Sequence, residues 1–329
     1  MPKFPPVPIG PLMFAAGITL SACSDRGGSA GPTAPSAGVR LSTEESVVDV
    51  GAKTYTTIDV PGGSAFEGAL DINGEGVIVG RYLSGGKTFG YLRSETGQFT
   101  TIKYPGAVFT VAAGINDRGD IVGHYSLPFA PTVRHGYLLR NDVFTSFDPP
   151  GSKRTNVLGI NDRGDIVGRL LGLDGKTHGF LFSEGEFTTI DYPGSIETNL
   201  WKINGRGQIV GAFRTPDGKS HLFVLRHGDF AAIDLPGVVD ITEDNGSINS
   251  RGDIVGTYCD VAPCVLAPTG NHGFLFSGGE LTTIDFPGSP ATVAFGINAR
   301  RDIVGSYYDA KGLALGFLLS GGEQHDAHE

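Results

Sequence analysis

The sequence predicts an all-β protein, a six-bladed β-propeller built from four-stranded antiparallel blades. Three observations lead to this fold. One sequence unit recurs six times, each unit contains four short segments of the kind that form strands, and no stretch of the repeated region keeps the apolar period of a helix. Four strands that recur about every 45 residues are typical of a propeller blade.

The six units can be aligned on the Asn of a repeated Ile-Asn dipeptide. These residues are spaced by 43, 45, 43, 45 and 49 positions and are Asn73, Asn116, Asn161, Asn204, Asn249 and Asn298. In the fourth unit the strand-like segments read TNLWKIN, QIVGAFR, SHLFVLRHG and DFAAIDLPG. They are rich in Val, Ile, Phe and Thr and are bounded by Gly, Asn, Asp or Pro, which is the pattern of short strands joined by turns.

The repeated region neither begins nor ends at a boundary between units. Residues 54–62 (TYTTIDVPG) match the end of a unit, whereas residues 313–322 (LALGFLLSGG) lack that final segment. We therefore predict that the N-terminal strand completes the last blade. Closing the ring in this way would remove sheet edges that otherwise invite association.

The sequence GINDRGDIVG occurs twice, at residues 114–123 and 159–168. We predict that it forms the hairpin between the innermost and the second strand, because Asn, Asp and Gly supply the backbone conformations of tight turns. Its Arg-Gly-Asp tripeptide recurs at 251–253 but is replaced in the other units. We interpret the tripeptide as turn chemistry; integrin-type adhesion is the alternative.

The pattern GIN-x-x-G-x-IVG, followed by HGFL, resembles the HAF-type extracellular repeat of bacterial secreted proteins. The third strand-like segment carries His-Gly-Phe or a variant, beginning at His135, His178, His221 and His272. The resemblance covers residues 54–322 and implies an exported, propeller-like domain. It implies no catalytic residues, because that family has no established common activity.

The first residues resemble a bacterial lipoprotein signal. Lys3 precedes an apolar run at residues 11–20, which is too short to span a bilayer. The run ends in Leu-Ser-Ala-Cys, which is similar to a lipobox. This implies that residues 1–22 are removed and that Cys23 is lipidated, which would anchor an exported protein in the cell envelope, in the outer membrane or periplasm or at the cell surface. An ordinary signal peptide is the alternative.

The remaining chain divides by composition. Residues 23–53 are expected to be the lipidated Cys and a flexible tether, since they are rich in Gly, Ser, Ala and Pro. Residues 54–324 are the propeller, and residues 325–329 a disordered tail. Export also predicts a disulfide between Cys259 and Cys264, with free thiols or half of a metal site as alternatives. The net charge of −10, with no basic run, excludes a nucleic-acid partner.

One face of the ring is predicted to bind. The hairpins after IN and after FLFS keep their length, but the connections from second to third strand and from outer strand to the next unit vary strongly. Both variable connections lie on one face of an alternating blade, and variable loops on a rigid scaffold usually carry binding. Residues that depart from the repeat on this face are the predicted ligand-binding residues: Arg81, His124, Arg169, Trp201, Glu243 and Asp244.

Each of these features also has a structural interpretation. Trp201 could stack on a sugar or pack inside its blade. The carboxylates Glu67, Asp240, Glu243 and Asp244 are candidate catalytic residues for acid–base chemistry, or a solvated loop. No cofactor is predicted, with Ca²⁺ as the exception that such an acidic group could bind. No metal site is predicted from the recurrent histidines, because the ring holds equivalent positions apart.

The sequence therefore predicts a lipid-anchored binding module that acts through its variable-loop face. Its partner would be a glycan, a peptide or an envelope protein, it would be a monomer, and the lipid would be its only contact with the membrane. The alternative is an extracellular hydrolase or lyase that acts on a polysaccharide or ester near blade five. The predicted propeller, residues 54–324, has no Gly-x-Ser-x-Gly and no His-Glu-x-x-His, which favours binding over catalysis.

Overall fold

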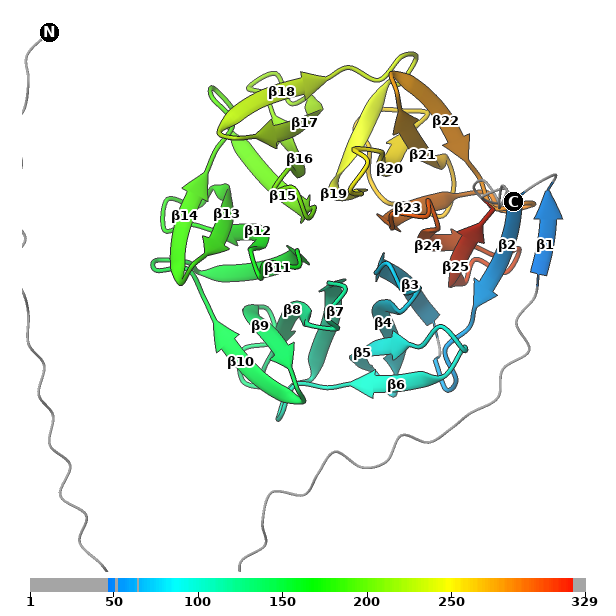
Figure 1. Ribbon diagram of the computed structural model, residues 1–329, viewed down its shortest axis with the longest axis horizontal. Coiled ribbons are helices and arrows are strands. Elements are labelled where there is room, and N and C mark those ends of the chain that lie inside the picture. The colour runs from blue at the N-terminus through cyan, green and yellow to red at the C-terminus, as the bar shows by residue number, and fades with distance from the viewer. Residues whose placement is uncertain (1–46, 51–52, 64, 322–329) are drawn as a thin grey trace, which may run out of the picture. The chain divides into compact units, whose positions relative to one another are not determined.

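The computed structural model describes residues 47–50, 53–63 and 65–321, and all regular elements in these ranges are β-strands. The strands form six blades around a central axis (Figure 1), as the sequence predicts. Within the same ranges, no helix has the length and apolar character needed to cross a membrane. The predicted signal peptide, Cys23 and the tail at 325–329 lie outside the described residues.

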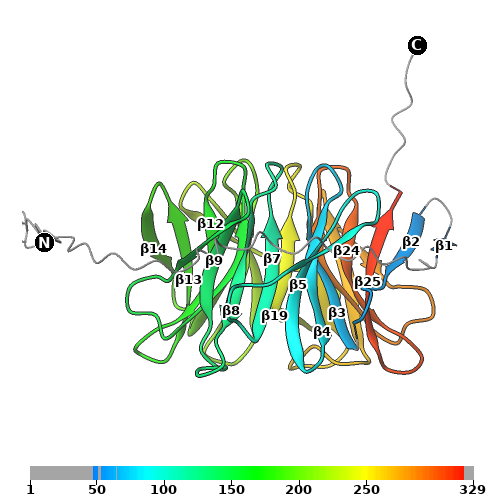
Figure 2. The same ribbon diagram turned by 90° about the horizontal axis from the view of Figure 1, so that it is seen from below.

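Five blades are continuous in sequence, each with four antiparallel strands running between the two faces of the ring (Figure 2). Blade 1 contains β3 (Ala65–Ile72), β4 (Ile78–Ser84), β5 (Lys87–Arg93) and β6 (Phe99–Ile102). Blade 2 contains β7 (Phe109–Ile115), β8 (Ile121–Ser126), β9 (His135–Arg140) and β10 (Val143–Phe147). Blade 3 contains β11 (Arg154–Ile160), β12 (Ile166–Leu171), β13 (Thr177–Ser183) and β14 (Glu186–Ile190). Blade 4 contains β15 (Glu197–Ile203), β16 (Ile209–Arg214), β17 (Ser220–Arg226) and β18 (Asp229–Ile233). Blade 5 contains β19 (Asp240–Ile248), β20 (Ile254–Cys259), β21 (Asn271–Ser277) and β22 (Glu280–Ile284).

The sixth blade joins the two ends of the repeated region. It contains β23 (Thr292–Ile297), β24 (Ile303–Tyr308), β25 (Ala314–Ser320) and β2 (Lys53–Ile58). Because β2 pairs with β25, placing Thr54 opposite Ser320, the predicted closure by the N-terminal strand is confirmed. An additional strand, β1 (Val47–Val50), pairs with β2 at the outer edge. It lies within the stretch 23–53 that we expected to be a tether, and its three valines favour an extended strand.

The Gly of the repeated Ile-Val-Gly sequence lies beneath an aromatic ring of the third strand. A Cβ atom on Gly168 would lie 2.2 Å from the carbonyl oxygen of Asn156 and 2.9 Å from the Phe180 ring. Phe180 is fully buried. The same contact recurs in every blade, and the rings are Tyr91, Tyr137, Phe180, Phe223, Phe274 and Phe317. The repeat therefore keeps Gly and the aromatic of HGF as a packed pair.

The Asn of each Ile-Asn dipeptide links its blade to the next. Asn116 donates from Nδ2 to the backbone oxygen of Asn161 at 3.1 Å, and this bond repeats through all six blades until Asn298 donates to Asn73 at 3.1 Å. We call these residues the Asn ring: Asn73, Asn116, Asn161, Asn204, Asn249 and Asn298. All six are buried. The motif therefore closes the propeller as well as turning the chain.

The Arg-Gly-Asp tripeptides belong to the same turns. The aspartates of the three copies, Asp120, Asp165 and Asp253, have exposed fractions of only 5%, 9% and 4%. Burial opposes ionisation of Asp120, but hydrogen bonds led by that from Arg140 lower its pKa to about 2. An adhesion signal needs an accessible carboxylate, so these buried carboxylates support the interpretation as turns.

Candidate functional site

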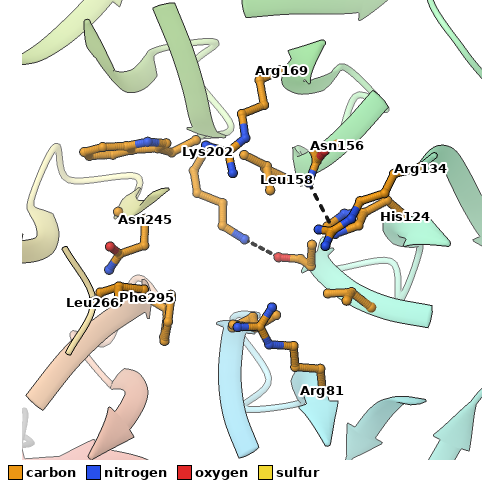
Figure 3. A pocket seen from close by; sticks show the side chains of 15 residues that line it. Arg81, His124, Arg134, Asn156, Leu158, Arg169, Lys202, Asn245, Leu266 and Phe295 are labelled. Carbon is orange, nitrogen blue, oxygen red and sulfur yellow. Dashed lines mark hydrogen bonds between the residues drawn. The ribbon is translucent and has the colours of Figure 1, made fainter. Parts of the chain in front are cut away.

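A cavity of about 250 Å³ lies in the central channel, at the end that belongs to the variable-loop face (Figure 3). We call it the axial cavity. Its polar groups come from the second strands, from the innermost strands and from the loop before β9. The second strands place Arg81, His124 and Arg169 there, the innermost strands place Asn156, Lys202 and Asn245, and the loop places Arg134. Among the described residues that line the cavity, none is an aspartate or a glutamate.

An ion pair across the channel forms the floor of this cavity. Nζ of Lys202 on β15 lies 2.9 Å from Oδ2 of Asp71 on β3, and it donates to the backbone oxygen of Ala113 at 2.6 Å. Asp71 also accepts from the backbone N–H of Ile115 at 3.1 Å. Burial lowers the pKa of Lys202, and the charge of Asp71 opposes that shift. The pair thus ties blade 4 to blades 1 and 2.

A second cavity of about 140 Å³ occupies the other end of the channel. Its wall includes all six residues of the Asn ring. Lys202 lines both cavities, so it separates the variable-loop end from the end that the repeat builds. Residues that differ between units therefore gather at one end, and residues that are shared gather at the other.

His124 positions a cation at the cavity wall. Its Nδ1 lies 3.4 Å from the backbone oxygen of Val157, a pure acceptor, so Nδ1 carries the proton. Nε2 is then the acceptor, facing Nη1 of Arg134 at 3.3 Å and Nδ2 of Asn156 at 3.5 Å. Burial lowers the pKa of His124 well below its ordinary value, and the charge of Arg134 adds to this effect. A neutral imidazole thus holds the guanidinium of Arg134, which also lies over the ring of Phe109 at 4.4 Å.

The structure brings four of the predicted binding residues together. Arg81, His124, Arg169 and Trp201 all line the axial cavity. Arg169 is held by a hydrogen bond of 3.2 Å from Nη1 to Oδ1 of Asn199. Trp201 is only 2% exposed, and its Nε1 donates to the backbone oxygen of Glu243 at 2.8 Å. Its indole therefore packs inside the wall, the second of the two roles considered for it.

The predicted acidic residues have other partners. Oε1 of Glu243 lies 2.6 Å from Nε of Arg214 and also accepts from the hydroxyl of Ser220. Oδ2 of Asp240 accepts from the backbone N–H of Cys264 at 2.9 Å. Neither carboxylate lines the axial cavity. The side chains of Glu67 and Asp244 lie outside the described part of the chain.

The long loop after β20 carries a residue over the cavity. Cys259 and Cys264 form a disulfide with their Cα atoms 5.3 Å apart. Asn271 fixes the next part of the loop by donating to the backbone oxygen of Val265 at 2.9 Å. Leu266, which follows, lines the axial cavity. The disulfide and Asp240 thus hold a short apolar flap at the mouth.

Two important residues, Lys202 and Arg134, were missed by the comparison of units. The position two residues before the ring Asn is Gly in units two, three and six, but Asp71 in the first unit and Lys202 in the fourth. In a ring of six blades the first and fourth units lie opposite each other. The pairing of Asp71 with Lys202 could therefore have been predicted from the sequence. Arg134 stands before His135, where the units with His178, His221 and His272 have Thr, Ser and Asn.

The recurrent histidines contact side chains of their own blades. His135 lies 2.7 Å from Asp148, and His272 lies 3.0 Å from Asp285. His178 is placed between two carboxylates, with Nδ1 2.8 Å from Asp191 and Nε2 3.2 Å from Asp174. In the described residues, no group of three or more His, Cys, Asp or Glu side chains is arranged to hold a metal ion.

The position of His178 predicts a pH-dependent contribution to stability. Burial opposes its protonation, but Asp191 and Asp174 outweigh this and raise its pKa above 6.5. A group whose pKa is higher in the folded than in the unfolded state stabilises the fold when the pH is below the unfolded-state pKa. This stabilisation is lost as the pH rises through the folded-state pKa. We expect Asp174→Asn to lower the melting temperature at pH 5.5 and much less at pH 9. The effect should be small, because Asp174 is exposed and solvent screens its charge.

The control for this measurement is Asp217→Asn. Asp217 occupies the equivalent loop position in blade 4, but its side chain accepts from the hydroxyl of Thr215 rather than from a histidine. Its effect should be the same at both pH values. Equal pH dependence of the two variants would contradict the assignment to His178.

Comparison with known proteins supports the fold. No protein-family model matches the chain, and no curated protein matches it in sequence. Among solved structures, a mutant of AofleA from Arthrobotrys oligospora is 12% identical, with a TM-score of 0.51 over 82% of this chain and 87% of that one. The Aleuria aurantia lectin in complex with Fucα1-6GlcNAc is 12% identical, with a TM-score of 0.50 over 81% and 96%. At these identities the similarity shows a shared fold.

Proposed function

We propose that this protein is a glycan-binding module that takes its ligand into the axial cavity from the variable-loop face. The observation that carries the proposal is the asymmetry of the channel. Its variable-loop end is a concave site in which polar groups converge from several blades, while its other end is built from the repeated Asn ring. Binding sites combine a concave shape with a few oriented polar groups in this way. The Aleuria lectin, bound to a fucosylated disaccharide, is an example of this fold serving as a glycan binder.

Apolar side chains on the same face support this proposal. Eight large hydrophobic residues are at least 39% exposed in the described part of the chain. Seven of them lie in the variable connections: Phe129, Leu173, Ile196, Val239, Val261, Val265 and Leu313. Exposed apolar surface that gathers at one face indicates a contact site. A ligand larger than the cavity would contact these loops as well.

Filling the mouth of the cavity tests the proposal. The full chain would be screened on an array of neutral and acidic glycans, and Leu266→Trp would be compared with wild type. We expect Leu266→Trp to weaken binding at least about tenfold, because the larger side chain occupies the space of the ligand. Val261→Trp is the matched control, since Val261 is 73% exposed in the same loop and does not line the cavity. Absence of any bound glycan, or equal binding by both variants, would contradict the proposal.

The location of the protein remains a separate proposal, which rests on the sequence alone. We propose that the chain is exported and anchored through lipidated Cys23, with residues 24–46 as a tether before β1. The resemblance of residues 20–23 to a lipobox and the HAF-like repeat support it. If this is correct, Cys23→Ser moves the protein from the detergent phase to the aqueous phase in a Triton X-114 partition.

A further inference from the structure

The fourth unit departs from the repeat at one position of its third strand. In the other blades this position, opposite the last residue of the outer strand, is glycine: Gly90, Gly136, Gly179, Gly273 and Gly316. A Cβ atom on Gly179 would lie 2.7 Å from the backbone oxygen of Ile190 on the outer strand. Blade 4 has Leu222 at this position, opposite Ile233. A side chain here needs room that the outer strands of the other blades do not leave.

Blades 4 and 5 lie side by side in the ring (Figure 1), and a cavity of about 200 Å³ lies between them, next to Leu222. We call it the interblade cavity. It is lined by the start of β17, the end of β18, the connection that follows and the start of β19, which places it on the variable-loop face. Among the described residues, none lines both this cavity and the axial cavity. Its volume lies below the usual range of sites for drug-sized ligands, so it suits a single small group.

A His–Asp pair that is closed in three other blades is open at this cavity. The closed pairs have Nδ1 of the ring at 2.7, 2.8 and 3.0 Å from a carboxylate oxygen and are His135–Asp148, His178–Asp191 and His272–Asp285. His221 and Asp234 hold the same two positions of the repeat, and both line the interblade cavity. Within the residues that the structure describes, the carboxylate of Asp234 forms neither an ion pair nor a hydrogen bond. The departure at Leu222 thus coincides with an open pair and a cavity.

The ring of His221 is oriented as in the other blades. Its Nε2 lies 3.4 Å from the hydroxyl of Thr215 in the loop before β17. In blade 5, Nε2 of His272 lies 3.3 Å from Asp260 in the corresponding loop. Because Nε2 of His221 points to this loop, its Nδ1 is directed toward the end of the outer strand, where Asp234 lies.

Thr215 decides which nitrogen of His221 carries the proton. Its hydroxyl donates its one hydrogen to Oδ1 of Asp217 at 2.5 Å, an oxygen that only accepts. Toward Nε2 the hydroxyl is therefore the acceptor, so Nε2 carries the proton of the neutral imidazole and Nδ1 has a lone pair. Nδ1 of His221 and the carboxylate of Asp234 are then two acceptors, which cannot bond to each other. A ligand between them has to supply hydrogen-bond donors.

An ammonium group fulfils this requirement. It carries three N–H donors and no acceptor, so one group can serve both Nδ1 of His221 and the carboxylate of Asp234. It also fits the charge of the site. Of the described residues that line the cavity beside the neutral imidazole, Asp234 and Asp240 are acidic and only Lys219 is basic.

The other walls of the interblade cavity are apolar. Leu222, Leu235, Val238 and Ile241 line it, and such side chains pack against the methylene groups of an alkyl chain. The hydroxyl groups of a sugar would find no partners there. Val239 at the same cavity is 64% exposed, so a group that is attached to a larger molecule can enter from solvent.

We propose that the interblade cavity is a second binding site, which takes a primary ammonium group at the end of a short alkyl chain. The ammonium donates to Asp234 and to Nδ1 of His221, and its methylene groups pack against the apolar wall. A small alkylamine and a lysine side chain of a partner protein share this chemistry. The site is separate from the axial cavity and does not depend on the proposed glycan ligand.

Three related ligands test the role of the ammonium group. NMR titration of the full chain would compare pentylamine with pentan-1-ol, which has no charge, and with pentyltrimethylammonium, which has the charge but no N–H donor. We expect pentylamine to bind at least about fivefold more tightly than either, because it alone forms charge-assisted hydrogen bonds to both acceptors. Its affinity should fall as the salt concentration is raised.

A second pair of ligands distinguishes the two sources of the ammonium group. Nα-acetyl-lysine methylamide would be compared with its norleucine analogue, which lacks the amine. Tighter binding of the lysine derivative supports a lysine side chain of a partner protein. Binding of pentylamine but not of the lysine derivative supports a small alkylamine. Either result supports the ammonium site.

Variants of exposed residues assign the binding to the interblade cavity. Asp234→Asn should weaken the binding of pentylamine by about fivefold or more, because it removes the negative charge and keeps the size of the side chain. Asp191→Asn is the matched control, since Asp191 holds the same position in blade 3 and is paired with His178 at 2.8 Å. Lys219→Gln should strengthen binding, because it removes a like charge from the cavity. Melting curves of each variant identify any loss of fold.

Three results would overturn the inference. The first is that neither pentylamine nor the lysine derivative binds. The second is equal affinity of wild type for pentylamine and pentan-1-ol. The third is an equal change of affinity in Asp234→Asn and Asp191→Asn. Since all of these ligands and variants address the interblade cavity, the effect of Leu266→Trp on glycan binding decides the proposed function separately.

Discussion

Replacement of Lys202 by Met should lower the free energy of unfolding by about 3–5 kcal/mol. The ammonium group of Lys202 neutralises Asp71 at 2.9 Å in the centre of the ring, where the Asp71 residue is only 7% exposed. Without it, the carboxylate keeps the N–H of Ile115 as a hydrogen-bond donor but loses its counter-charge. A buried charge that has lost its partner is strongly destabilising, even where the intact pair adds little stability.

A double-mutant cycle separates the loss of the pair from the loss of packing. Urea unfolding would be measured for Lys202→Met, for Asp71→Asn and for the double variant. We expect the double variant to be more stable than Lys202→Met alone, because it no longer buries a charge. Lys219→Met, at an exposed position of the same blade, should change stability by no more than about 0.5 kcal/mol. Equal effects of Lys202→Met and Lys219→Met would show that the ion pair does not support the ring.

The fold was predictable because the repeat determines it at two levels. Four strand-like segments per unit define a blade, and six units with a displaced first segment define a ring closed by the N-terminal strand. The interaction between blades was not predictable from the same pattern. Asn116 reads as a turn residue in the sequence, and only the curvature of the ring brings its amide to the backbone oxygen of Asn161.

The binding site was predictable in part for a related reason. Comparison of equivalent positions identified Arg81, His124 and Arg169, because all three stand at the same place on the second strand. Arg134 also departs from the residues before the other recurrent histidines, but the sequence does not show that it contacts His124 and Phe109.

The acidic group illustrates what a single sequence leaves undetermined. Glu243 departs from the Thr of four other units, which indicated a possible acid, base or metal ligand. The structure places Arg214 of the neighbouring blade 2.6 Å from it. A residue 29 positions earlier in the chain thus provides the counter-charge, and only the packing of blade 4 against blade 5 creates this contact.

Replacement of Asn116 by Ala should lower the free energy of unfolding by about 3 kcal/mol. Its Nδ2 donates to Asp120 at 3.0 Å and to the backbone of Asn161 at 3.1 Å. Its Oδ1 accepts from the backbone N–H groups of Arg118 at 3.1 Å and Asp120 at 2.9 Å. Alanine removes all four bonds and leaves buried polar groups without this partner, which costs more than the bonds themselves contribute.

Two further variants show whether the loss arises from the buried amide of Asn116 rather than from any change in a turn. Asn73 makes the bond to the next blade and accepts two backbone N–H groups, but its unit has Val77 where the others have Asp or Gln. Asn73→Ala should therefore cost less than Asn116→Ala. Arg251→Ala changes an exposed side chain in an equivalent turn and should stay within about 0.5 kcal/mol of wild type. If urea unfolding shows the largest loss of stability for Asn116→Ala and the smallest for Arg251→Ala, the stability comes from the buried amides of the Asn ring. Equal losses in all three variants would show that it comes from the turns alone.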